Sequence, residues 1–233
     1  MASDKQKVVN ELFNREAENF ANAISKQIDN KSYYRGYLFE AFLTKYIKPE
    51  DDAIVLDYGC GVGSITKLIY DRGFRIDGYD PSSENIRIAS NYNLPPERVR
   101  FRLLSDHGES LQDEFYNAII CSSVIEFVED PDRLLAHFYR SLKPRGILII
   151  SFANKRSLWR WYAKIRFKEK PHYQFQYHVT TQSEFKIFLN RAGFKQVGSV
   201  RYFDSAFEKW RVTNLLNYLP FIGTLGIVAA RRE

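Results

Sequence analysis

Residues 55–64 read VLDYGCGVGS, and this stretch decides the fold. An apolar strand runs directly into glycines at positions 59, 61 and 63, and a helical pattern begins at Ser64. Glycine lets the backbone pass close to a ligand, and the first turn of a helix offers unpaired N–H groups to it. The stretch therefore predicts a strand, a turn and a helix that bind a nucleotide-like cofactor, with a tight turn that binds nothing as the alternative.

Strand-length apolar runs alternate with helical patterns from residue 53 onward, as in the βαβ units of a parallel sheet. The expected strands are residues 53–58, 75–79, 99–104, 116–121, 146–152, 195–203 and 222–231. The expected helices are residues 64–70, 83–90, the stretch after the Asp130–Pro131 cap, and 181–192. We predict an α/β fold with a Rossmann-like, seven-stranded, mostly parallel sheet and helices on both faces.

Two amphipathic helical patterns, residues 5–28 and 34–47, precede the sheet and are expected to cap its carboxyl edge. The predicted organisation is an N-terminal helical cap over residues 1–50 and one domain over residues 51–233. A basic, aromatic insert after the fifth strand, residues 155–180, is expected to form a substrate lid. A length of 233 residues with 45% hydrophobic residues suits one such domain.

The composition favours a cytoplasmic protein without a metal site. The first thirty residues lack an unbroken apolar stretch, and the apolar residues 215–230 contain a proline and fall short of a bilayer span. The two cysteines, Cys60 and Cys121, have neither metal-ligand spacing nor a disulfide framework around them.

The positive charge of the chain is local. Residues 155–170 contain seven basic residues and one acidic residue, so this stretch carries a charge equal to the formal net charge of +6 of the whole chain. Aromatic residues, Trp159, Trp161 and Tyr162 among them, are interspersed with these cations. Such a mixture is suited to an anionic or lipid-linked acceptor, to an acidic membrane surface or to nucleic acid, and a simple amphipathic lid is a further reading.

The glycine turn differs from a dinucleotide fingerprint. That fingerprint requires Gly or Ala five positions after its first glycine, where this chain has Ser64. The glycine pattern preceded by Asp57 instead resembles motif I of the class I S-adenosylmethionine-dependent methyltransferases. The second strand ends at Asp80, 21 residues after Gly59, where a carboxylate can accept both ribose hydroxyls.

The resemblance implies S-adenosylmethionine as the cofactor, and a set of residues around it. Asp106 is expected to meet the adenine amino group and His107 the adenine edge, while Tyr34 and Arg35 would lie near the methionine end, where the guanidinium can pair with a carboxylate. The complete expected cofactor set is Asp57, Gly59, Cys60, Gly61, Gly63, Asp80, Pro81, Ser82, Asp106, His107, Ser122, Tyr34 and Arg35.

Two further motifs refine the resemblance. Residues 121–135, CSSVIEFVEDPDRLL, and residues 141–154, SLKPRGILIISFAN, resemble the ubiquinone-biosynthesis type of small-molecule O-methyltransferase. Many of those enzymes have a histidine directly after the glutamate, whereas Phe127 follows Glu126 here, so a histidine base cannot be carried over to that position. The resemblance covers residues 54–154.

The sequence thus predicts methyl transfer to a small-molecule acceptor, with a hydroxyl oxygen favoured. His178, and then His172, are the candidate bases because they close the insert beside the active edge of the sheet. An RNA acceptor is a less favoured alternative, since no Asn- or Asp-Pro-Pro-aromatic sequence follows the fourth strand. A lipid-linked acceptor reached by peripheral membrane contact, and a non-catalytic cofactor-binding module, also remain open.

Overall fold

A computed structural model gives the structure of residues 4–49, 52–104, 111–158, 160–162, 175–202 and 223–233. Its strands are β1 (Ile54–Tyr58), β2 (Arg75–Asp80), β3 (Val99–Leu103), β4 (Tyr116–Cys121), β5 (Leu142–Ala153), β6 (Phe194–Tyr202) and β7 (Leu225–Arg232). Its helices are α1 (Asp4–Asp29), α2 (Tyr34–Tyr46), α3 (Ser64–Asp71), α4 (Ser83–Ser90), α5 (Pro131–Ser141) and α7 (Gln182–Arg191), with a 3-10 turn at Ile125–Phe127.

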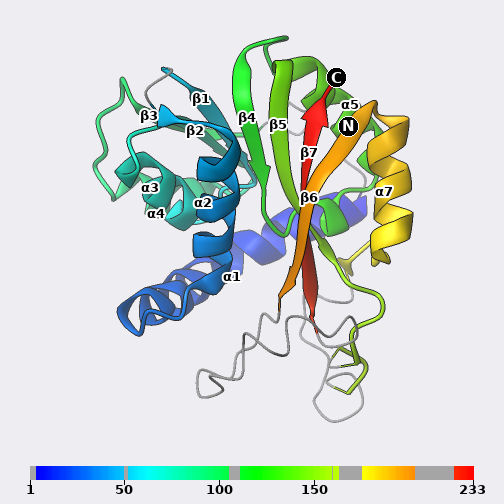
Figure 1. Cartoon of the computed structure of the whole chain (residues 1–233). Helices are drawn as coiled ribbons and strands as arrows, with labels where there is room; N and C mark the ends of the chain where they lie inside the picture. The colour runs from blue at the N-terminus through cyan, green and yellow to red at the C-terminus, as the bar shows by residue number, and fades with distance from the viewer. Residues whose placement is uncertain (1–3, 50–51, 105–110, 159, 163–174, 203–222) are drawn as a thin grey trace.

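The seven strands form one sheet in the order β3-β2-β1-β4-β5-β7-β6 (Figure 1). All pairings are parallel except those of β7, which runs antiparallel to both β5 and β6. The predicted Rossmann-like fold class is therefore confirmed. The strand order reverses between β1 and β4, and ligands of such sheets bind at the carboxyl ends of the strands that flank this point.

Apolar side chains cover both faces of the sheet. On one face α2 and α3 pack through Phe39, Leu43 and Ile69. On the other face α5 and α7 pack through Phe138 and Leu189, among others. The inner strands β1, β4, β5 and β7 are buried on both faces and read as continuous apolar runs, which is why the sequence revealed them, whereas the edge strand β3 is partly exposed.

The helix starts follow local capping signals. The Asp130 carboxylate accepts a hydrogen bond from the backbone N–H of Arg133, and Pro131 takes the first position of α5. Thr181 and Glu184 form a reciprocal capping box at the start of α7. These caps explain why both helix starts were predicted within a residue.

The two N-terminal helices take different positions, so the expectation that both cap the carboxyl edge was wrong for α2. Helix α1 crosses below the sheet in Figure 1, and the Asn14 side chain accepts a hydrogen bond from the backbone N–H of Glu84, just beyond the end of β2. Helix α2 packs against a sheet face instead, because Phe39 and Leu43 give it an apolar side that must be buried. Among the described residues, no helix is both long and apolar enough to cross a membrane.

Candidate active site

All three glycines of the β1–α3 turn have the left-handed backbone conformation. Gly59, Gly61 and Gly63 have φ angles of 75°, 54° and 78°, which residues with a side chain seldom adopt. The backbone N–H groups of Gly59 and Cys60 both donate to the carbonyl oxygen of Tyr79, at 2.7 and 3.0 Å. These bonds hold the turn against β2.

The surroundings of the three glycines differ. A Cβ atom added to Gly59 would lie 2.1 Å from Cγ2 of Val124, and one added to Gly63 would lie 2.9 Å from Cβ of Ala89. A Cβ added to Gly61 would meet no atom of the described residues within 4 Å. Gly59 and Gly63 are therefore needed for packing, whereas Gly61 borders open space from which a ligand can approach the backbone.

Asp80 connects this turn to the end of β2. Its Oδ2 accepts the backbone N–H of Gly61 at 2.8 Å, and its Oδ1 accepts the backbone N–H of Ser82 at 2.9 Å and the amide of Asn85 at 3.1 Å. A carboxylate can accept about four hydrogen bonds, so these three leave acceptor capacity for a ligand hydroxyl. Burial raises the pKa of this carboxyl, against the lowering effect of its hydrogen bonds.

Asp57 lies one strand away, at the end of β1, and is 1% exposed. Its Oδ2 accepts the hydroxyl of Thr66 at 2.7 Å, while Oδ1 has no hydrogen-bond partner among the described residues. Burial raises the pKa of Asp57 to about 7. A buried oxygen without a partner costs free energy, and a ligand or water bound beside the turn would satisfy it.

Cys60 and Ser82 lie inside this arrangement rather than at its mouth. The thiol of Cys60 is buried beneath the turn, and burial raises its pKa. Ser82 caps α4 by accepting the backbone N–H of Asn85, and its hydroxyl donates to Oδ1 of Asn14 at 2.9 Å. Pro81, between Asp80 and Ser82, is half-buried. Asn14 gave no signal in the sequence, because its role depends on α1 crossing the edge of the sheet.

Arg35 extends from the start of α2 to the carboxyl end of β4. Its Nη1 donates to the hydroxyl of Ser123 at 3.2 Å, and the backbone N–H of Ser123 donates to the hydroxyl of Ser151 at 2.7 Å. The buried hydroxyl of Ser122 has no hydrogen-bond partner among the described residues. Tyr34 is 46% exposed. The structure thus brings Arg35 and Ser122 to the same edge as the glycine turn and leaves Tyr34 largely in solvent.

Glu126, which the sequence analysis did not select, is a buried carboxyl at this edge. It is 2% exposed, and its Oε2 has no hydrogen-bond partner among the described residues. Burial raises the pKa of Glu126 to about 7, although the positive charges of Arg160 and Arg35 act in the opposite direction. The backbone carbonyl oxygen of Glu126 accepts hydrogen bonds from the backbone N–H groups of Tyr177 and His178. The end of the insert therefore lies against the backbone of Glu126.

The ring of His178 faces another group of residues. Its Nε2 lies 3.3 Å from the carbonyl oxygen of Glu129, and the ring packs edge-on against Phe188 of α7. It also borders a small apolar cavity with Pro131 and Phe185. His172, Asp106 and His107 lie outside the described residues, so their predicted roles stay predictions.

The sequence model of a methyltransferase-domain family matches residues 31–198 of the chain. The ubiquinone biosynthesis O-methyltransferase of Rickettsia akari is 31% identical over 120 residues, which cover 51% of this chain and 47% of that protein. The chain thus spans about half the length of this curated relative.

Solved structures show the same fold. An S-adenosylmethionine-dependent methyltransferase of Thermotoga maritima, described as a possible histamine N-methyltransferase, has a TM-score of 0.68 and 20% identity, covering 95% of this chain and 100% of that one. The 1,6-didemethyltoxoflavin-N1-methyltransferase of Burkholderia thailandensis, solved with 1,6-didemethyltoxoflavin and S-adenosylhomocysteine, has a TM-score of 0.65 and 18% identity, covering 99% and 90%.

The family match spans most of the chain and contains the glycine turn, Asp80 and the motif after β4. The predicted resemblance is confirmed: the chain belongs to the methyltransferase-domain family, the class I S-adenosylmethionine-dependent methyltransferases, whose cofactor is S-adenosylmethionine.

Proposed function

We propose that the chain transfers a methyl group from S-adenosylmethionine to a hydroxyl oxygen of a small-molecule acceptor. The observation that carries this proposal is the buried carboxyl of Glu126, with one oxygen free of partners within the described residues, in the turn that follows β4, the strand next to β1. The choice of oxygen as the methylated atom is supported by the name of the Rickettsia akari relative.

The residues of the turn fit the cofactor. Gly61 borders open space, Asp80 has acceptor capacity for a ribose hydroxyl, and Oδ1 of Asp57 has no partner within the described part of the chain. In the proposed arrangement Arg35 pairs with the methionine carboxylate, and Asp106 and His107 contact the adenine. The cofactor supplies an electrophilic methyl group on its sulfonium.

The chain then has to hold and deprotonate the acceptor. A base works best when its pKa lies near the working pH, and burial brings the pKa of Glu126 to about 7. Its ionised form is favoured by the charges of Arg35 and Arg160, and the insert closes over its carbonyl. We propose that Glu126 accepts the proton of the acceptor hydroxyl. The position of the acceptor between the turn and the insert contributes the rest of the rate acceleration.

Substitution of Glu126 tests this assignment against the candidate His178. Turnover of a hydroxyl acceptor found by screening should rise with pH through about 7, as Glu126 ionises, and then level off. Glu126→Gln should lower turnover about 100-fold or more and remove this pH dependence, while S-adenosylmethionine binding stays unchanged. His178→Gln, the matched control, should retain most of the turnover. The reverse result, with His178→Gln inactive and Glu126→Gln active, would identify His178 as the general base.

A lipid-linked acceptor is a second candidate, favoured by exposed apolar side chains in the insert. Leu158 is 60% exposed and Trp161 is 66% exposed, and the cations Lys155 and Arg156 precede them. Aromatic and basic side chains of this kind bind anionic membrane surfaces. Trp161→Ser combined with Leu158→Ser should lower sedimentation with phosphatidylglycerol vesicles severalfold; equal sedimentation of the variant and the wild type, or none by either, removes this candidate.

A further inference from the structure

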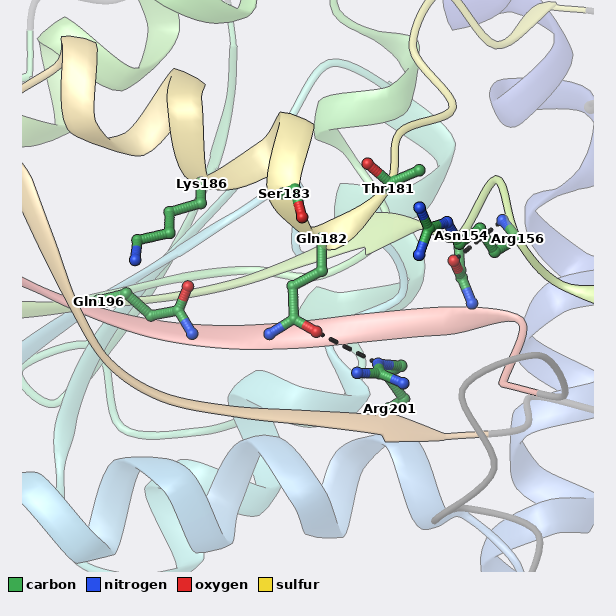
Figure 2. Close-up of a pocket in the computed structure, with 8 residues that line it drawn as sticks. All are labelled: Asn154, Arg156, Thr181, Gln182, Ser183, Lys186, Gln196 and Arg201. Atoms are coloured by element: carbon green, nitrogen blue, oxygen red, sulfur yellow. Dashed lines mark hydrogen bonds between the residues drawn. The ribbon is translucent and has the colours of Figure 1, made fainter.

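A polar cavity of about 280 Å³ lies between α7 and the outer strand β6 (Figure 2). Strand β6 runs parallel to β5, because both are antiparallel to β7. Arg201 near the end of β6 and Asn154 just beyond the end of β5 therefore line the cavity at the carboxyl edge of the sheet. The cavity extends from this edge along β6 to Gln196, near the start of the strand, and β4, β5 and β7 separate β6 from the strand that leads into the glycine turn.

Three cations from different parts of the chain line this cavity. Arg156 belongs to the insert, Lys186 to α7 and Arg201 to β6. Within the described part of the chain, none of them forms an ion pair and no acidic residue lines the cavity. The acid next to it, Glu184, accepts the backbone N–H of Thr181 at 2.7 Å, so it is held in the helix cap. Three like charges around one cavity are stabilised when an anion binds between them.

The polar side chains of the cavity are arranged in advance of binding. Gln182 accepts the Nε–H of Arg201 at 3.2 Å and donates its own amide to the hydroxyl of Ser199 at 2.9 Å. This bond fixes the guanidinium through Nε, and its two terminal nitrogens make no hydrogen bond within the described residues. Figure 2 shows Lys186 and Gln196 at one end of the cavity, Asn154 and Arg156 at the other, and Gln182 with Arg201 between them. A guanidinium held in this way loses little conformational freedom when it binds an anion.

The first turn of α7 adds to this positive potential. Its capping box uses the backbone N–H groups of Thr181 and Glu184. The N–H groups of Gln182 and Ser183 belong to the turn that has no intrahelical acceptor. Both Gln182 and Ser183 line the cavity.

We propose that this cavity binds the phosphate group of a phosphate monoester. A phosphate dianion suits a cavity lined by three cations better than a carboxylate does, because it carries more charge and can accept hydrogen bonds from both terminal nitrogens of Arg201, while Lys186 and Arg156 add positive potential from the two ends of the cavity. The volume exceeds the needs of a bare phosphate and admits the organic part of a small ester. The site is a binding site and takes no part in methyl transfer, so it is independent of the proposed function.

The test is a calorimetric titration of the whole chain with inorganic phosphate and with glycerol 3-phosphate, at constant ionic strength. We expect saturable binding that Lys186→Gln/Arg201→Gln weakens roughly tenfold or more. The control, Arg191→Gln/Lys195→Gln, removes two cations of the same elements that do not line the cavity, where Arg191 pairs with Asp132 and Lys195 with Glu233. It should leave the affinity within about twofold of wild type.

The source of the phosphate is tested by sedimentation with vesicles of phosphatidic acid and of phosphatidylcholine. Weaker sedimentation of the Lys186→Gln/Arg201→Gln variant with phosphatidic acid alone indicates a lipid headgroup as the ligand. Unchanged sedimentation, together with weakened glycerol 3-phosphate binding, indicates a soluble ester. Absence of saturable binding of either soluble anion to wild type, or equal loss in the control variant, overturns the proposal.

Discussion

Gly61→Ala is expected to fold nearly as well as the wild type and to lose most of its affinity for S-adenosylmethionine. The added Cβ meets no atom of the described residues within 4 Å, so the cost in stability is limited to the positive φ angle. That cost is about 1–2 kcal/mol, or a fall of about 2–8 °C in melting temperature for a chain of this size. The same methyl group occupies the open space where we propose that the cofactor binds, so we expect affinity to fall about tenfold or more.

Gly59→Ala is the comparison variant, because Gly59 and Gly61 both have a positive φ angle but differ in the atoms around them. Its Cβ would lie 2.1 Å from Cγ2 of Val124, so the segment after β4 or the turn must move. Overpacking and the positive φ angle together cost about 2–5 kcal/mol. Thermal unfolding and calorimetry of both variants separate the two effects. Wild-type affinity in a folded Gly61→Ala protein would contradict the placement of the cofactor at this turn.

Asp80→Asn is expected to weaken S-adenosylmethionine binding about 10- to 100-fold, because hydrogen bonds to a charged acceptor contribute about 1.5–3 kcal/mol. Asparagine keeps the shape of the side chain, and its one oxygen can accept either the N–H of Gly61 or that of Ser82, which donate to different oxygens of Asp80. It therefore preserves the turn better than alanine would. Isothermal calorimetry of the variant measures the effect directly.

Asp77→Asn is the matched control, since Asp77 lies on the same strand and is also buried. Its carboxylate accepts the hydroxyl of Tyr116 at 3.4 Å, away from the glycine turn. We expect its affinity for S-adenosylmethionine to stay within about twofold of wild type. Equal weakening by both substitutions would mean that Asp80 acts through the charge of β2 as a whole and makes no hydrogen bond to the ligand.

The sequence could predict the parts of the site that depend on neighbouring residues. The three glycines require left-handed backbone wherever they lie, and the apolar runs on either side define β1 and α3. Asp80 follows from the same reasoning, because parallel neighbouring strands bring their carboxyl ends to one edge. Local sequence therefore determines the turn and the acid beside it.

Contacts between distant segments could not be predicted in this way. Asn14 lies 68 residues from Ser82, and its bonds depend on the direction in which α1 crosses the sheet. Glu126 is buried because the end of the insert donates two backbone N–H groups to its carbonyl. His178 was selected for its place in the chain, but the orientation of its ring depends on packing with Phe188 of α7.

The basic insert shows the same limit of local reasoning. The positive charge of the insert was visible in the sequence. The cavity that Arg156 lines is also lined by Lys186 and Arg201, which lie outside the insert. Helix α7 and strand β6 place Lys186 and Arg201 at this cavity in the folded chain. A cluster of this kind has no linear motif.

A structure of the chain crystallised with S-adenosylhomocysteine tests the central claim most directly. The account predicts the ligand between the glycine turn and Asp80, with a ribose hydroxyl within about 3.2 Å of the Asp80 carboxylate and the homocysteine end toward Arg35. A ligand bound elsewhere on the chain, or one whose ribose makes no contact with Asp80, would contradict it.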